Sequence, residues 1–308
     1  MKDEFDIAAG SVIGRDHVIA GKNNQDAYAI ARMPVGMVAV VCDGCGSRPS
    51  SEVGAKIGAQ LVSDAVMKYC VYGFDERRPA DPRTLPGAAA YLEDARQHIL
   101  KELRSIAKAM GGELRDIVND FFLFTVVGTV VMDLATWTFS IGDGVVAMNP
   151  VRDSPPRWPS GRASAGAISN GVNGTVRTLG PFPKNEPPYL SYGLLPTSLT
   201  DTAPELLRFQ VHDVLPTAAV QSVFIGSDGV VDLMEREGQK IPGKDERVPP
   251  LAQFWTEDRY FKNPDMIRRR FAMMNRETTT INWEGREVQK CVGLLPDDTT
   301  VVVIRRKG

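Results

Sequence analysis

The sequence predicts an α+β fold in which two packed antiparallel sheets are flanked by helices. Three observations predict it. Apolar, β-branched segments occur in clusters along the chain. Long segments with helical periodicity stand between the clusters, not between single strands. The strict alternation of strand and helix that is typical of a doubly wound parallel sheet is absent, so antiparallel sheets are favoured.

The first 45 residues contain the first cluster of predicted strands. Three apolar segments (5–14, 27–33 and 36–44) are separated by turns that contain Gly, Asn or Pro. A helix is expected next, because apolar residues then recur at helical spacing and Ser50 or Ser51 can cap its first turn. This part of the chain predicts strands followed by a covering helix.

The middle of the chain repeats this order with a longer helix. Segment 88–110 has one apolar face and ends before a Gly-Gly pair, as helices often do. Three apolar segments (121–133, 136–143 and 144–149) follow, and we expect antiparallel neighbours joined by tight turns. Segment 150–204 contains ten of the 21 prolines. It is predicted to be an irregular surface excursion within one domain.

The last third of the chain predicts two further strands and two helices. Segment 221–226 reads as a strand and leads into a helix at 230–237. Another helix is expected to begin at Asn263-Pro264, with Asn as N-cap and Pro at the first helical position. The final strand is expected at 299–305. Together the segments predict a single domain over residues 1–308.

The composition excludes several classes of protein. Of the 308 residues, 43% are hydrophobic and 24% charged, and the net charge is -2, which does not favour nucleic acid or an anionic membrane as partner. No apolar run reaches the roughly 20 residues of a spanning helix, and the N-terminus lacks a signal-peptide pattern, so we expect a cytoplasmic protein. With three histidines and four cysteines, a histidine-based or zinc-thiolate site is disfavoured.

Acidic residues stand at the ends of four apolar segments. Asp43-Gly44, Asp143-Gly144 and Asp228-Gly229 each follow one, and Asp297-Asp298 precedes the last. A single Asp-Gly pair most often marks a turn. Turns alone do not readily explain why carboxylates stand at four different strand ends. We expect these carboxylates to converge and to bind hard divalent cations.

Five motifs follow one another along nearly the whole chain. They are Asn23-Asn24-Gln25-Asp26-Ala27, Val41-Cys42-Asp43-Gly44-Cys45-Gly46, Ile141-Gly142-Asp143-Gly144, Ser227-Asp228-Gly229-Val230-Val231-Asp232 and Asp297-Asp298-Thr299-Thr300. In this order they resemble the motifs of the metal-dependent (type 2C) protein phosphatases. The segment 14–27 and the residues after Cys42 resemble the divergent bacterial branch of this family.

The resemblance implies a four-layer α-β-β-α sandwich with two Mg²⁺ or Mn²⁺ ions at one end. Asp43 would bridge the two ions, and the carbonyl of Gly44 would bind one of them. Asp228 and Asp297 would complete the centre. Oxygen ligands of this kind suit Mg²⁺ and Mn²⁺.

Three further acidic residues receive roles from the same resemblance. Asp26 would hold a water bound to the metals, and it joins Asp43 and Asp228 as the predicted catalytic set. Asp143 and Asp232 match positions that bind a third, weaker ion in some relatives. Two close ions can deprotonate a shared water and stabilise phosphoryl transfer without a protein nucleophile.

The sequence departs from the family at the residue that grips the substrate phosphate. The family usually has Arg five residues before the first Asp, and Gly21 stands there. We expect His17 or Lys22 to contact the phosphate instead, with lysine acting as a point charge. Solvated loop residues are the alternative reading of both.

We therefore expect a phosphatase that acts on phosphoserine and phosphothreonine in a protein substrate. Two alternatives stay open. One is a catalytically silent relative that binds or regulates a partner, which the missing Arg supports. The other is a hydrolase for small phosphate esters.

Overall fold

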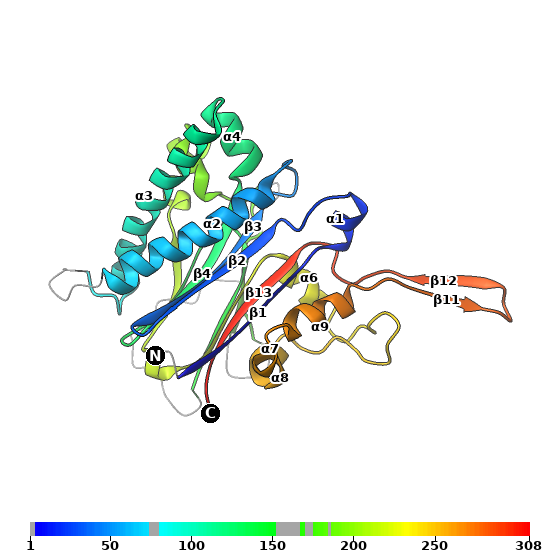
Figure 1. The fold of residues 1–308 in the computed structure, drawn as a ribbon. Coiled ribbons are helices and arrows are strands. Elements are labelled where there is room, and N and C mark those ends of the chain that lie inside the picture. Colours follow the sequence, from blue (N-terminus) through cyan, green and yellow to red (C-terminus); the bar gives the residue numbers. More distant parts are fainter. Residues whose placement is uncertain (1–3, 74–79, 152–166, 170–174, 184–185) are drawn as a thin grey trace.

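The predicted fold class is confirmed by a computed structural model, which describes residues 4–73, 80–151, 167–169, 175–183 and 186–308. Two large antiparallel sheets pack face to face, and helices cover their outer faces (Figure 1). Much of the predicted proline-rich excursion at 150–204 lies outside the described residues.

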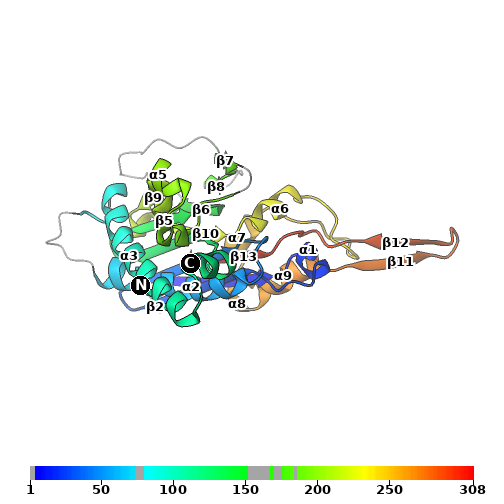
Figure 2. The same ribbon diagram turned by 90° about the horizontal axis from the view of Figure 1, so that it is seen from above.

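The two large sheets have the orders β1-β13-β10-β6-β8-β7 and β2-β3-β4-β5-β9, and every pairing in them is antiparallel. A separate hairpin, β11-β12, extends away from both (Figures 1 and 2). The strands are β1 (Phe5–Val12), β2 (Asp26–Met33), β3 (Gly36–Gly44), β4 (Phe124–Met132), β5 (Thr136–Ile141), β6 (Gly144–Pro150), β7 (Ala167–Ser169), β8 (Thr175–Leu179), β9 (Gln210–Leu215), β10 (Val220–Gly226), β11 (Thr278–Asn282), β12 (Glu287–Cys291) and β13 (Thr299–Arg306).

Helices form the two outer layers. They are α1 (Arg15–Ile19), α2 (Ser51–Val66), α3 (Leu85–Met110), α4 (Leu114–Phe121), α5 (Ser198–Thr202), α6 (Gly229–Glu235), α7 (Gln253–Thr256), α8 (Arg259–Lys262) and α9 (Met266–Met274). A π-helix (Met67–Tyr72) extends α2, and short 3-10 helices lie at Leu190–Leu194, Pro204–Leu207 and Thr217–Ala219. Helix α2 packs on β2 and β3, and α9 packs on β1, as Figure 1 shows.

The core explains why the strands read as unbroken apolar runs. On β3, Val38, Val40 and Cys42 face the layer of α2 and α3, whereas Ala39 and Val41 face the other sheet. Both faces of the strand are therefore buried, and alternation between polar and apolar residues disappears. Each fully buried side chain of this size contributes about 1.5–3 kcal/mol, so the two sheets hold the strand ends rigidly.

One predicted pairing is wrong. The segment 144–149 was expected to pair with the strand before it, but β6 pairs with β10 and β8 in the opposite sheet. The chain crosses between the sheets at Gly142 and Gly144, whose φ angles are +90° and +135°. Such angles favour glycine, and a Cβ on Gly142 would lie 2.6 Å from Thr125. Asp143 is held between these glycines, at the crossing.

Other boundaries also differ from the predictions. Helix α9 begins at Met266 with Asp265 as its N-cap residue, because the Asn263 side chain accepts a hydrogen bond from the Asp265 amide and forms a turn first. Strand β9, the β11-β12 hairpin and helices α1 and α4 were not predicted. Among the described residues, no helix has both the length and the apolar content that a membrane span requires.

Candidate active site

Most of the predicted site residues line a single pocket of about 220 Å³ at one end of the sandwich. They come from the N-terminus, the middle and the C-terminus of the chain. The pocket is lined by His17, Asp43, Gly44, Cys45, Gly46, Ser47, Thr125, Asp143, Pro187, Tyr189, Asp228 and Asp297.

Strand ends bring the carboxylates together. Asp43 lies at the end of β3, directly opposite Asp26, the first residue of β2. Asp228 follows β10 and precedes helix α6, and Asp297 stands before β13, the neighbour of β10. Asp143 lies at the crossing between the sheets. Because both sheets are rigid, these carboxylates cannot easily move apart.

Burial and the negative charge of neighbouring acids raise the pKa values of four of the acids, namely Asp26, Asp43, Asp143 and Asp297. Burial, and then the negative charge of Asp228, raise the pKa of Asp43 well above its usual range. The same two causes raise the pKa of Asp143 to about 7 and that of Asp297 to about 6. For Asp26 the pKa is also raised, by burial and then by Asp298. Holding carboxylates so close is unfavourable unless positive charge lies among them.

Unpartnered oxygen atoms show that the site suits a hard cation. Oδ1 of Asp26 and Oδ1 of Asp228 are buried and accept no hydrogen bond. The other oxygen of Asp26 accepts a 2.7 Å hydrogen bond from the Ser227 hydroxyl. At Gly44 a Cβ would lie 2.8 Å from the Gln25 carbonyl, so only glycine fits. Buried oxygens without donors are the ligands that Mg²⁺ and Mn²⁺ prefer.

Asp232 lies outside the pocket lining, as does Asp26. Asp232 is on α6, one turn after Asp228, and is partly buried. Burial, and then the charge of Asp228, raise the pKa of Asp232. It is thus an electrostatic neighbour of the pocket.

The two basic residues predicted to contact phosphate have different surroundings. His17, on α1, lines the pocket, and its Nε2 lies 3.7 Å from Asp297 Oδ1. Lys22 is exposed and does not line the pocket; its ammonium donates a hydrogen bond to the carbonyl of Gly46, a residue of the pocket wall. Lys22 therefore lies at the rim, and His17 lies among the acids.

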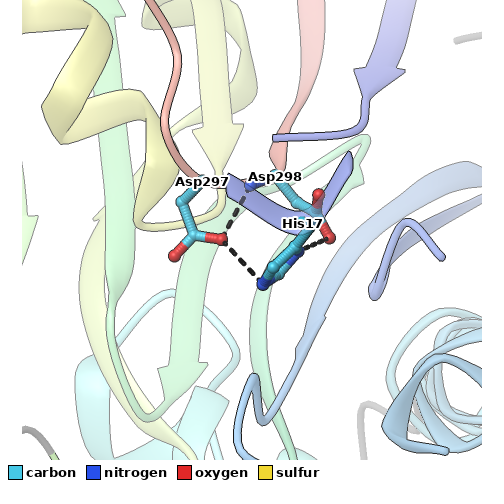
Figure 3. Close-up of side chains that lie close together, drawn as sticks. All are labelled: His17, Asp297 and Asp298. Atoms are coloured by element: carbon cyan, nitrogen blue, oxygen red, sulfur yellow. Dashed lines mark hydrogen bonds and ion pairs between the residues drawn. The ribbon is translucent and has the colours of Figure 1, made fainter. Parts of the chain in front are cut away.

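Asp298 points inward and supports the N-terminal loop. Its side chain is 2% exposed, and it accepts 2.6 Å hydrogen bonds from the amides of Gly14 and Gln25. Its Oδ2 also lies 2.9 Å from Nδ1 of His17 (Figure 3). The sequence marked both Asp297 and Asp298 as candidate site residues. Only the structure shows that Asp297 lines the pocket and that the buried Asp298 supports the loop.

Other pocket residues had no signal in the sequence. Thr125 lies opposite Asp43 on β4. Tyr189 comes from the segment after the proline-rich stretch, near Cys45, and burial raises its pKa. Ser47 contacts Cys45 Sγ at 3.3 Å. None of these residue types indicates a phosphatase by itself.

The sequence also matches a known protein family. The sequence model of the family described as Protein phosphatase 2C matches residues 13–257. The chain belongs to this family. Its members are metal-dependent serine/threonine phosphatases, so the predicted family is confirmed. No curated protein sequence matches the chain.

The fold is shared with a solved phosphatase structure, and two bacterial phosphatase structures align with lower scores. The serine-threonine phosphatase 2C from Toxoplasma gondii aligns with a TM-score of 0.54 and 13% identity, over 100% of this chain and 96% of that one. PstP/Ppp from Mycobacterium tuberculosis aligns with a TM-score of 0.46 and 14% identity, over 99% and 100%. Stp1 from Staphylococcus aureus aligns with a TM-score of 0.45 and 12% identity, over 98% and 95%.

Proposed function

We propose that the protein hydrolyses phosphoserine and phosphothreonine in protein substrates, with two Mg²⁺ or Mn²⁺ ions in the acidic pocket and residues 1–308 acting as one domain. One observation carries the proposal. Carboxylates from distant strand ends converge on one pocket. Two buried carboxylate oxygens at this end, Oδ1 of Asp26 and Oδ1 of Asp228, accept no hydrogen bond. Family membership supports the reaction class.

Asp43, the Gly44 carbonyl, Asp228 and Asp297 are the residues that would hold the two ions. All four line the pocket. Asp143 also lines it, and Asp232 lies beside it; these two would serve a third, weaker ion. Bound there, the ions would lower the pKa of a water and stabilise the charge on the phosphoryl group.

Asp26 is the residue we assign to the attacking water. The Ser227 hydroxyl holds one carboxylate oxygen of Asp26 and leaves the other, Oδ1, unpartnered. An oxygen fixed in this way can accept a proton from water and orient it toward phosphorus. Without a metal, burial and then the charge of Asp298 raise the pKa of Asp26.

Lys22 is the residue we assign to the substrate phosphate. Its ammonium is exposed at the rim and reaches the pocket wall at Gly46, whereas His17 faces the acids. We expect Lys22→Ala to raise KM for a phosphopeptide, with a smaller change in kcat. An unchanged KM would mean that Lys22 does not contact the substrate phosphate and is a solvated loop residue.

A catalytically silent binding module is the second candidate. Gly21, at the position of the family's phosphate-binding Arg, has a φ angle of +67° and no neighbour that a side chain would meet. The described residues that line the pocket include no arginine. Manganese-dependent hydrolysis of p-nitrophenyl phosphate that is lost in Asp43→Asn would exclude the silent module. Rates on phosphopeptides and on free phosphate metabolites would then separate a protein phosphatase from a small-ester hydrolase.

A further inference from the structure

His17 is a nitrogen donor placed among carboxylates, and the fold holds it there. Helix α1 is tied to the segment just before Asp297, because the amides of Arg15 and Asp16 donate to the carbonyls of Leu295 and Pro296 at 2.9 and 3.0 Å. These bonds fix the register between α1 and the pocket acid. The imidazole of His17 is therefore positioned by backbone, and its side chain is only 14% exposed.

Asp298 is committed to supporting His17 and its loop. Both of its oxygens accept backbone amides, from Gly14 and Gln25, and Oδ2 lies 2.9 Å from His17 Nδ1. No hydrogen bond of good geometry reaches Nδ1, so the contact is electrostatic. Asp298 therefore lies against one side of the imidazole, and the opposite nitrogen, Nε2, is the one on the side of Asp297.

The other nitrogen faces Asp297. His17 Nε2 and Asp297 Oδ1 are 3.7 Å apart, which is too far for a hydrogen bond. Two adjacent ligands of one ion, each bound at about 2.0–2.2 Å, lie about 2.8 to 3.6 Å apart in octahedral or tetrahedral geometry, and the separation of 3.7 Å is slightly above this range. Among the described residues, ligand atoms of His17, Asp297 and Asp298 lie within 4.8 Å of one another (Figure 3).

We propose that His17 Nε2 binds one of the two metal ions together with Asp297, while Asp298 holds the imidazole from behind. The inference rests on the proposed metal centre and deepens it. A carboxylate–histidine–metal arrangement orients the ring and strengthens the ligand. Imidazole also suits transition metals better than Mg²⁺. The consequence is a centre that binds Mn²⁺ in preference to Mg²⁺ and uses His17 for the difference.

Pulsed electron paramagnetic resonance of the Mn²⁺-loaded full-length protein tests this directly. We would compare protein grown with ordinary histidine and with ¹⁵N-labelled histidine. A directly bound imidazole gives a nitrogen coupling that changes with the isotope. We expect that coupling in the wild type and its loss in His17→Gln. His98→Gln is the matched control and should keep the coupling, since His98 packs against Tyr69 and does not line the pocket.

Binding isotherms complete the test. His17→Gln should weaken Mn²⁺ binding by a larger factor than Mg²⁺ binding. Asp298→Asn should weaken Mn²⁺ binding by about 10- to 100-fold, the usual effect of losing the partner of a ligand histidine. Circular dichroism of each variant would establish that it is folded.

The outcomes separate the inference from the proposed function. If Mn²⁺ binds to the wild type without histidine coupling, His17 forms an ion pair with Asp297 and Asp298, and the inference is wrong while the centre stands. If neither Mn²⁺ nor Mg²⁺ binds, the proposed centre fails and the inference fails with it. Isotope-sensitive coupling that disappears only in His17→Gln supports both.

Discussion

Strand β13 runs between two ends of the sandwich whose charged side chains are arranged in opposite ways. At its start, Asp297 and the neighbouring Asp143 and Asp228 face one another, and burial and repulsion raise the pKa values of Asp143 and Asp297. At its end, Arg305 and Arg306 are surrounded by acceptors. Several carboxylates are thus crowded at one end of this strand, whereas opposite charges are paired at the other.

The paired end shows how charge serves stability. Arg306 donates to the carbonyls of Thr217 and Val220 at 2.7 and 3.1 Å, and its guanidinium lies 4.5 Å from the ring centre of Phe5. Arg305 bonds Asp258 at 2.9 Å and lowers the pKa of that acid. These contacts satisfy groups at the ends of strands.

The volume of a cavity does not identify which of the two ends is functional. The paired end has a cavity of about 330 Å³, larger than the acidic pocket of about 220 Å³. The acidic pocket is the better candidate for chemistry because its groups are held in an unfavourable charge state that a ligand can relieve. Four experiments test this contrast, and they follow in order of expected effect.

Asp43→Asn should abolish catalysis and yet stabilise the metal-free protein. Losing the partner of a metal ligand costs about 10- to 100-fold, so losing a central ligand should reduce kcat/KM by more than about 100-fold. Removing one of several repelling charges should raise the Tm of the metal-free protein. Phosphatase assays and thermal melts measure the two effects. A lower Tm would mean that Asp43 is not repelled, and the contrast between the ends would fail.

Metal removal should make stability depend on pH. In the metal-free protein the pKa values of Asp143 and Asp297 are raised from 3.8 to about 7 and about 6. The unfolded chain ionises these groups more easily, so stability should be lowest above pH 7 and should rise as pH falls through 7 and 6. Mn²⁺ at 100 times its Kd should add about 2.7 kcal/mol. Thermal melts with EDTA and with Mn²⁺, from pH 8 to 5, measure both effects. If the Tm in EDTA decreases as the pH is lowered from 8 to 5, the predicted direction of the pH dependence is wrong.

Arg306→Ala should destabilise the protein and leave catalysis intact. The substitution removes the donors of two carbonyls and the contact with Phe5. We expect the free energy of unfolding to fall by about 1–3 kcal/mol. Urea unfolding measures it, and kcat/KM on a phosphopeptide is the control. If Arg306→Ala lost activity at unchanged stability, the end of the sandwich that contains Arg306 would be the functional one.

Asp258→Asn should have the smallest effect. Asp258 is 64% exposed and pairs with Arg305 and Lys262 at the surface, where ion pairs contribute little. We expect a change in Tm below about 2 °C and unchanged activity. A large loss of stability would show that the paired end depends on this ion pair more than on the buried contacts of Arg306.

Much of the fold could be predicted because its signals are local. The strands β3, β4, β10 and β13 are apolar runs with both faces buried, and such runs can be recognised in the sequence alone. The hairpin β11-β12 is exposed along its length, so no burial pattern marked it. Helix α4 was not predicted, and its last residue, Phe121, was read as the start of the strand because it continues the apolar run of β4.

The candidate site was predictable to the same extent. Asp43, Asp228 and Asp297 follow or precede apolar runs, and rigid strand ends bring Asp43 and its partners to one pocket. The opposite orientations of Asp297 and Asp298 could not be predicted, because adjacent residues differ only in which neighbours they meet. Nor could the place of His17, which depends on α1 pairing with a segment 280 residues away in the chain.

The sequence by itself determined the family, the two-sheet class and the carboxylates at the strand ends, because these rest on short patterns of residue type. Only the tertiary structure decided that the chain crosses between sheets at Asp143, that Asp298 turns inward, and that His17 faces Asp297. The reason is physical. Periodicity records whether a residue is buried, but the partner that it meets depends on how distant strands are packed side by side.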